Sequence, residues 1–318
     1  MSNFLFSVNV TFPIFLVMVL GYVLRRIGML NDNFVTVANK FNFKVTLPVL
    51  LFRDLSNVDI QAVFDVKYVL FCAIATSICF WSVWGLAKIF MKDKTMIGAF
   101  TQASFRSSAA VMGLAFIQNI YGASTMGSLM IIGAVPLYNI YSVLVLTFEA
   151  NDSENEGKRD TARIRQAGIN ILKNPIIIGI VLGLIVALLH NPLPTLVNKT
   201  VSTTAQMATP LALVALGAGF EGRKALAKIK PTLWAAFIKL IAQAAIFIPI
   251  AGLCGFTGEK MVALVVMLAA PATPSCYIMA KNMHNDGTLT ASIVVATTLL
   301  ASLTLTGWIF ILKTVGWI

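Results

Sequence analysis

The chain has 318 residues, of which 58% are hydrophobic and 12% charged, and its formal net charge at pH 7 is +11. Soluble domains carry about 25% charged residues, so this composition excludes an ordinary soluble domain and indicates an integral membrane protein. The positive charge does not indicate nucleic-acid binding, because the basic residues lie in short segments between apolar runs.

Apolar runs near 20 residues recur along the whole chain, and a helix needs about 20 residues to cross a bilayer core of about 30 Å. We expect helices, because the alternating pattern of barrel strands is absent from these runs. The ten predicted spans are residues 8–24, 34–55, 68–89, 95–120, 128–148, 175–189, 201–220, 232–254, 261–280 and 288–313.

The loop charges predict the orientation of these spans. If the N-terminus is outside, fifteen Lys and Arg residues fall on the inner side and five on the outer side. This bias follows the positive-inside rule. The sequence therefore predicts a multi-pass plasma-membrane protein with both termini outside.

The two halves of the chain resemble each other. PIFLVMVLG at 13–21 and PIIIGIVLG at 175–183 share five of nine residues, and the same offset of 162 places Pro48 on Pro210. Each half has five predicted spans, an odd number, so the second must begin on the opposite side of the membrane. This predicts an inverted-topology pair: a first five-helix repeat (1–148), a flexible cytoplasmic linker (149–173) and a second repeat (174–318).

Inverted-repeat transporters bind substrate near the midplane, where helices are interrupted in corresponding positions of the two halves. The fourth span contains SFRSSAAVMG, with Arg106, Ser107 and Ser108, and the ninth contains AAPATPSCYIMAK. Proline removes a backbone donor and clashes with the preceding turn, so Pro271 and Pro274 should break the ninth helix. A simple proline kink is the alternative. The candidate substrate-binding residues at the two interruptions are Arg106, Ser107, Ser108, Pro271, Thr273, Pro274 and Ser275.

Arg106 is the most informative residue, because it lies about 16 Å along the fourth span, near the middle of the bilayer core. A charge there is costly unless it is paired or solvated. Every acidic residue falls in a loop or at a predicted helix end, so no carboxylate partner is evident. Two interpretations remain open. The guanidinium caps carbonyls freed by a broken helix, or it helps to hold an anion that also meets a helix N-terminus.

Three further polar residues are candidates for the same site. Lys239, about two turns into the eighth span, is either a cavity charge or a snorkelling lysine. Asn39 and Asn42 form a polar stripe with Thr46 before Pro48. That stripe lines a water path or serves helix packing.

The remaining chemistry-bearing residues predict neither an enzyme nor a metal or cofactor site. The four cysteines lie in apolar runs without paired-ligand spacing, and His190 and His284 are far apart in sequence. The spans contain no Ser/His/Asp, Cys/His or paired-carboxylate set.

Four segments taken together carry a family resemblance: FPIFLVMVLGYVLRRIGML, Asn39–Lys40 leading to Leu47–Pro48, ASFRSS and AAPATPSCYIMAK. In these segments the chain resembles the auxin efflux carrier family, which includes PIN-type auxin carriers and bacterial malate permeases. The resemblance covers nearly the whole chain. It implies an all-α membrane fold of ten helices in two inverted five-helix repeats, with crossed, broken fourth and ninth helices as in bile-acid symporters. It also implies transport of small organic anions. Ser107 and Ser108 depart from the Asn or Pro frequent there, and the absence of a long central loop favours a bacterial carrier.

The leading hypothesis is therefore a secondary carrier of small carboxylates such as malate, working by alternating access in the lipid bilayer. No phosphate-cradling loop suggests ATP drive. The absence of midplane acids argues against a carboxylate proton relay or sodium cage. The alternative is a membrane sensor that binds an anion without moving it, against which the lack of an output domain argues. Homodimerisation is left open.

Overall fold

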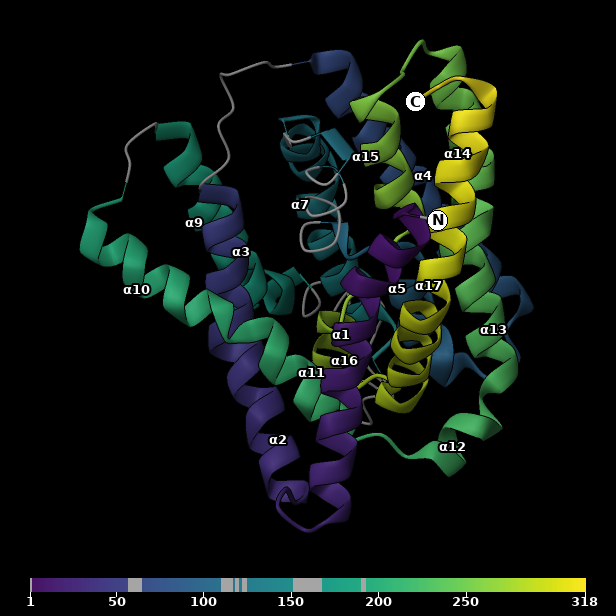
Figure 1. Ribbon diagram of the computed structural model, residues 1–318. Coiled ribbons are helices and arrows are strands. Elements are labelled where there is room, and N and C mark those ends of the chain that lie inside the picture. Colours follow the sequence, from purple (N-terminus) through teal and green to yellow (C-terminus); the bar gives the residue numbers. More distant parts are fainter. Residues whose placement is uncertain are drawn as a thin grey trace.

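In the computed structural model the described residues are 2–56, 65–109, 117, 120–121, 125–150, 168–189 and 193–318, and the elements among them are helices (Figure 1). The end of the predicted fourth span and most of the predicted linker lie outside the described residues.

The helices of the first half follow the predicted spans. A π-helical turn, η1 (Asn42–Thr46), joins α2 to α3 into one continuous rod, and a short 3₁₀ turn, η2 (Lys94–Met96), precedes α5. The α-helices are α1 (Ser2–Arg26), α2 (Asp32–Phe41), α3 (Leu47–Ser56), α4 (Val66–Phe90), α5 (Ile97–Phe105) and α7 (Thr125–Phe148).

The second half follows its predicted spans too, apart from one element that we did not predict, the six-residue α12 in a polar connection. A second π-helical turn, η5 (Ile238–Ala242), joins α13 to α14. The α-helices are α9 (Pro175–Leu189), α10 (Thr195–Gln206), α11 (Ala208–Ala218), α12 (Gly222–Ala227), α13 (Ile229–Phe237), α14 (Gln243–Leu253), α15 (Glu259–Ala269), α16 (Ser275–Asn282) and α17 (Gly287–Val315).

Five helical stretches in the described part of the chain are long and apolar enough to cross a membrane, and α9 is a shorter apolar helix of 15 residues. The five stretches are Val66–Phe90, Leu129–Phe148, Thr195–Ala218, Ile229–Leu253 and Gly287–Val315. The prediction of an all-α, multi-pass membrane protein is confirmed at this level.

Short polar side chains fix where several helices begin. Asn31 accepts a hydrogen bond from the Phe34 N–H at 2.8 Å before α2, and Asp65 accepts one from the Tyr68 N–H at 3.0 Å before α4. Asp286 does the same before α17. Each cap satisfies one of the N–H groups that a helix start leaves without an intrahelical partner.

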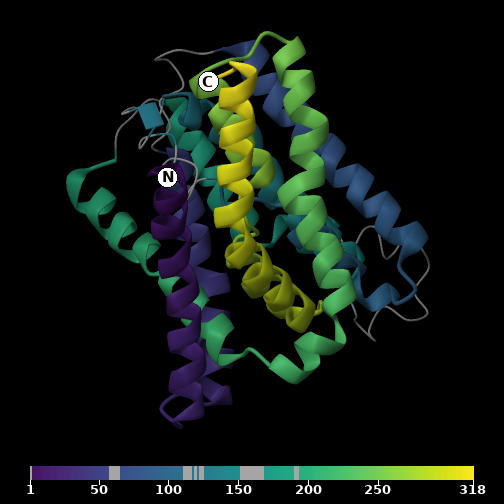
Figure 2. The ribbon, with the colours of Figure 1, turned by 45° about the vertical axis from the view of Figure 1, so that its right-hand side comes forward.

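The helices form two groups. α1, α2–α3, α9 and α10–α11 pack on one another, and we call this group the frame. The second group, which we call the inner bundle, consists of α4, α5, α7, α13–α14, α15, α16 and α17 (Figures 1 and 2). Its helix α17 also contacts α1 of the frame.

Within the frame each half of the chain packs on the other. α1 packs against α11 and α9 packs against α3. The backbones approach closely because glycines face them: a Cβ on Gly217 would overlap the Met18 carbonyl, and one on Gly179 would overlap the Pro48 carbonyl. Small residues allow this approach between membrane helices, where packing rather than the hydrophobic effect favours association.

The chain ends lie toward one end of the molecule. In both views the N- and C-termini are in the upper half, whereas the turn between α1 and α2 and the short α12 lie at the lower end (Figures 1 and 2). The lower end carries the basic residues Arg25, Arg26, Arg223, Lys224 and Lys228.

Candidate functional site

The interruption in the first half begins where α5 ends at Phe105. Arg106 has an extended backbone (φ −78°, ψ 131°), and Ser107 and Ser108 are also outside the helix. The Ser107 hydroxyl donates to the Val266 carbonyl at 3.1 Å and lies 3.3 Å from that of Ala270, and the Ser108 N–H donates to the Pro271 carbonyl at 3.0 Å. The first interruption is therefore bonded directly to the second.

The interruption in the second half lies where the two prolines predict it. α15 ends at Ala269, Ala270 is extended (φ −71°, ψ 154°), and α16 begins at Ser275. Proline at 271 offers no N–H and restricts the residue before it to extended backbone, which ends the helix. The Thr273 and Ser275 hydroxyls are 3.2 Å apart in the gap. The break is thus more than a kink.

Side chains from neighbouring helices donate to three carbonyls at the ends of α5 and α15. The Tyr138 hydroxyl donates to the Met267 carbonyl at 2.9 Å. The Lys239 ammonium donates to the Leu268 carbonyl at 3.1 Å and lies 3.4 Å from Oε1 of Gln243, whose amide in turn donates to the Ser104 carbonyl at 2.9 Å. These bonds meet the requirement that backbone groups at membrane depth find partners inside the protein.

Arg106 is buried, with 5% of its surface exposed. Its Nη2 donates to Oδ1 of Asn139 at 2.6 Å and its Nη1 lies 2.8 Å from the Met279 sulfur. The Asn139 amide is itself oriented, because it donates to the Val135 carbonyl at 2.8 Å. Among the described residues both guanidinium partners are side chains, so these bonds give no support to the interpretation that Arg106 caps broken-helix carbonyls.

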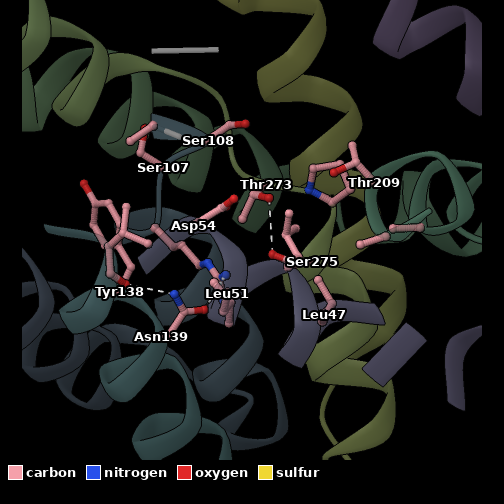
Figure 3. Close-up of a pocket in the computed structure, with 17 residues that line it drawn as sticks. Leu47, Leu51, Asp54, Ser107, Ser108, Tyr138, Asn139, Thr209, Thr273 and Ser275 are labelled. Carbon is pink, nitrogen blue, oxygen red and sulfur yellow. Dashed lines mark hydrogen bonds between the residues drawn. The ribbon is translucent and has the colours of Figure 1, made fainter. Parts of the chain in front are cut away.

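A cavity of about 60 Å³ lies between α3 and α11 of the frame and the two interruptions and α7 of the inner bundle. It has room for a few water molecules. Its walls carry six predicted site residues, Arg106, Ser107, Ser108, Thr273, Pro274 and Ser275. Four of the six carry hydroxyl groups and are labelled in Figure 3: Ser107, Ser108, Thr273 and Ser275. The figure also labels Tyr138, Asn139 and Thr209, which line the cavity but were not predicted from the sequence.

The other four predicted site residues lie outside the cavity lining. Asn42 donates to the Ala208 carbonyl at 2.9 Å and so ties η1 to α11, and the Asn39 carbonyl accepts from Asn282 at 3.2 Å. Lys239 is fully buried, and its ammonium donates to the Leu268 carbonyl near the end of α15. The Pro271 carbonyl accepts a hydrogen bond from the Ser108 N–H. These residues join helices around the cavity.

Asp54 also lines this cavity, although sequence reasoning did not name it as a site residue (Figure 3). Its carboxylate is paired with Arg53 and not with Arg106, whose described partners are Asn139 and Met279. Asp54 sits in the last turn of α3, as its predicted helix-end position requires. Its spacing gave a signal: Leu47, Leu50, Leu51 and Asp54 follow an i, i+3, i+4, i+7 pattern, so they share one face of α3. The sequence did not show which residues of other helices face this side of α3.

The sequence matches the family described as "Membrane transport protein" over residues 6–309. Proteins named "Uncharacterized transporter YfdV" from Escherichia coli strain K12, E. coli O157:H7 and Shigella flexneri are each 22% identical to it over 294 residues, which is 92% of this chain and 93% of theirs. With a helical membrane fold and a cavity that residues of both interruptions help to line, the match places this chain in the auxin efflux carrier-like membrane transport protein family.

Proposed function

We propose that this membrane transporter is a secondary carrier of small organic anions, such as malate or other carboxylates. The observation that carries the proposal is the buried Arg106 guanidinium in a cavity that also presents hydroxyl groups from both interruptions. Carboxylates accept charge-assisted hydrogen bonds from arginine and ordinary ones from hydroxyls. Helix α16 begins at the cavity residue Ser275. The partial positive charge at the N-terminus of a helix favours an anion there.

We further propose that the chain forms ten spans in two inverted repeats. Gly21 and Gly183, which share the offset of 162 residues, both face a helix of the other half, and α1–α11 and α9–α3 are matching contacts. In this scheme α5 belongs to the fourth span, and α15 and α16 belong to the ninth. The cavity lies between frame and inner bundle, so a displacement of one group against the other would open it to alternate sides.

The transport proposal is tested with purified protein in proteoliposomes. We expect radiolabelled malate, or another carboxylate from a panel of mono- and dicarboxylates, to enter faster than into protein-free vesicles. Unlabelled anion should compete, whereas the uncharged diamide of the same acid should not. Saturable binding without flux would favour an anion sensor, and equal competition by the diamide would contradict an arginine-centred site.

The proposed orientation predicts which loops a membrane-impermeant maleimide reaches. Met29 lies in the turn between α1 and α2, where it is 73% exposed, and Thr257 lies between α14 and α15. A cysteine at 29 should react only from the cytoplasmic side, since Arg25 and Arg26 flank that turn, and one at 257 only from outside. Labelling of both from the same side of the membrane would defeat the inverted arrangement.

A further inference from the structure

Two charged side chains line the cavity, and a third is paired with one of them. Arg106 and Asp54 are the charged residues among those that line it. Asp54 is paired with its neighbour: Oδ1 accepts from Nη2 of Arg53 at 2.6 Å and from Nε at 3.0 Å. The two side chains of this pair are 25% and 17% exposed. Their charges cancel, so the cavity lining together with this pair carries a net charge of +1 from Arg106. The Lys239 ammonium lies outside the lining, where it bonds to the Leu268 carbonyl and to Gln243.

A single positive charge sets how much negative charge the cavity can hold. Charges in a weakly polar interior interact far more strongly than in water, and an uncompensated one is costly. A singly charged carboxylate would bring the site to neutrality. A dicarboxylate would leave one negative charge unbalanced, beside the carboxylate of Asp54.

We infer that this carrier selects singly charged carboxylates over dicarboxylates, and that Asp54 sets the preference. Asp54 acts in two ways, because it adds a negative charge to the cavity wall and it holds the Arg53 guanidinium in an ion pair. Malate, a dianion at neutral pH, would then bind less tightly than a monoanion of its size. The inference rests on the proposed function and narrows its substrate class.

The test compares succinate with its monomethyl ester, which has the same carbon backbone and one charge fewer. Binding to purified protein is measured by calorimetry at pH 8, where each free carboxyl is ionised. We expect wild type to bind the ester at least about tenfold more tightly, since one unbalanced charge is of that order. Asp54→Asn frees Arg53 and removes a negative charge, so the ratio should fall to about one or reverse.

Two variants act as controls. Asp32→Asn breaks another arginine–aspartate pair, Arg25–Asp32, whose carboxylate is 92% exposed outside the cavity, so the ratio should not change. Arg53→Gln leaves Asp54 unpaired and lowers the local charge to zero. Both ligands should then bind less tightly, succinate more so, and this variant carries the test if Asp54→Asn does not fold.

The outcomes separate the inference from the function beneath it. If no carboxylate in the transport panel binds wild type, the proposed function fails and the inference with it. If carboxylates bind but the ester has no advantage, or Asp54→Asn or Arg53→Gln leaves the ratio at its wild-type value, the inference is wrong while the proposed function stands.

Discussion

Replacing Arg106 with lysine should weaken anion binding by roughly 10- to 100-fold, which corresponds to the loss of about 1.5–3 kcal/mol expected for a hydrogen bond to a charged group. Lysine keeps the charge but lacks the planar fork, so it cannot meet Asn139 and Met279 while also presenting two donors to a carboxylate. Arg106→Gln should go further, since it also removes the positive charge that attracts an anion. The measurement is anion affinity and flux on purified variants.

Thermal unfolding of the same samples separates binding from folding. Arg106 contacts side chains of α7 and α16, so its loss should lower the melting temperature modestly while anion affinity collapses. A stable Arg106→Gln protein with wild-type affinity would remove Arg106 from the site. A variant that loses folded protein without any dependence on ligand charge would restore the structural interpretation.

Gly217→Ala should destabilise the protein by about 1–3 kcal/mol, the cost of overpacking a close contact. A Cβ at this position meets the backbone carbonyl of Met18, which cannot turn aside as a flexible side chain would, so α11 and α1 must separate. The loss is read as a lower melting temperature in detergent and less folded protein in the membrane.

Gly307→Ala is the matched control, because a Cβ there meets nothing within 4 Å and the position is exposed on α17. Alanine is the better helix former by up to about 1 kcal/mol, so this variant should be as stable as wild type or more so. Equal destabilisation by the two substitutions would show that the α1–α11 contact has no special role.

Hydropathy predicted the helices because a bilayer core needs about 20 apolar helical residues to cross it, and lipid leaves no water to satisfy the backbone of an open chain. The break at Pro271 and Pro274 was predictable from covalent chemistry, since proline lacks the donor that the helix needs. Arg106 was noticeable because a cation in an apolar run is costly. Each of these signals is local in sequence.

Long-range partners could not be predicted in this way. Asn42 and Lys239 have the polarity of cavity residues, yet they bond to the Ala208 and Leu268 carbonyls on other helices. Asp54 has the position of an ordinary helix-end acid, yet it lines the cavity. Whether a polar side chain joins helices or lines a cavity depends on what faces it, and the sequence of one helix does not contain that information.

The reciprocal packing of α1 on α11 and α9 on α3 has a consequence for biosynthesis. Met18 and Pro48 are synthesised long before Gly217 and Gly179, so the early helices enter the bilayer without the partners that their close contacts require. Contacts between residues so distant along the chain close late and slowly. The first half must therefore remain in the bilayer, or bound to the insertion machinery, until α9 and α11 are synthesised and can pack against α3 and α1.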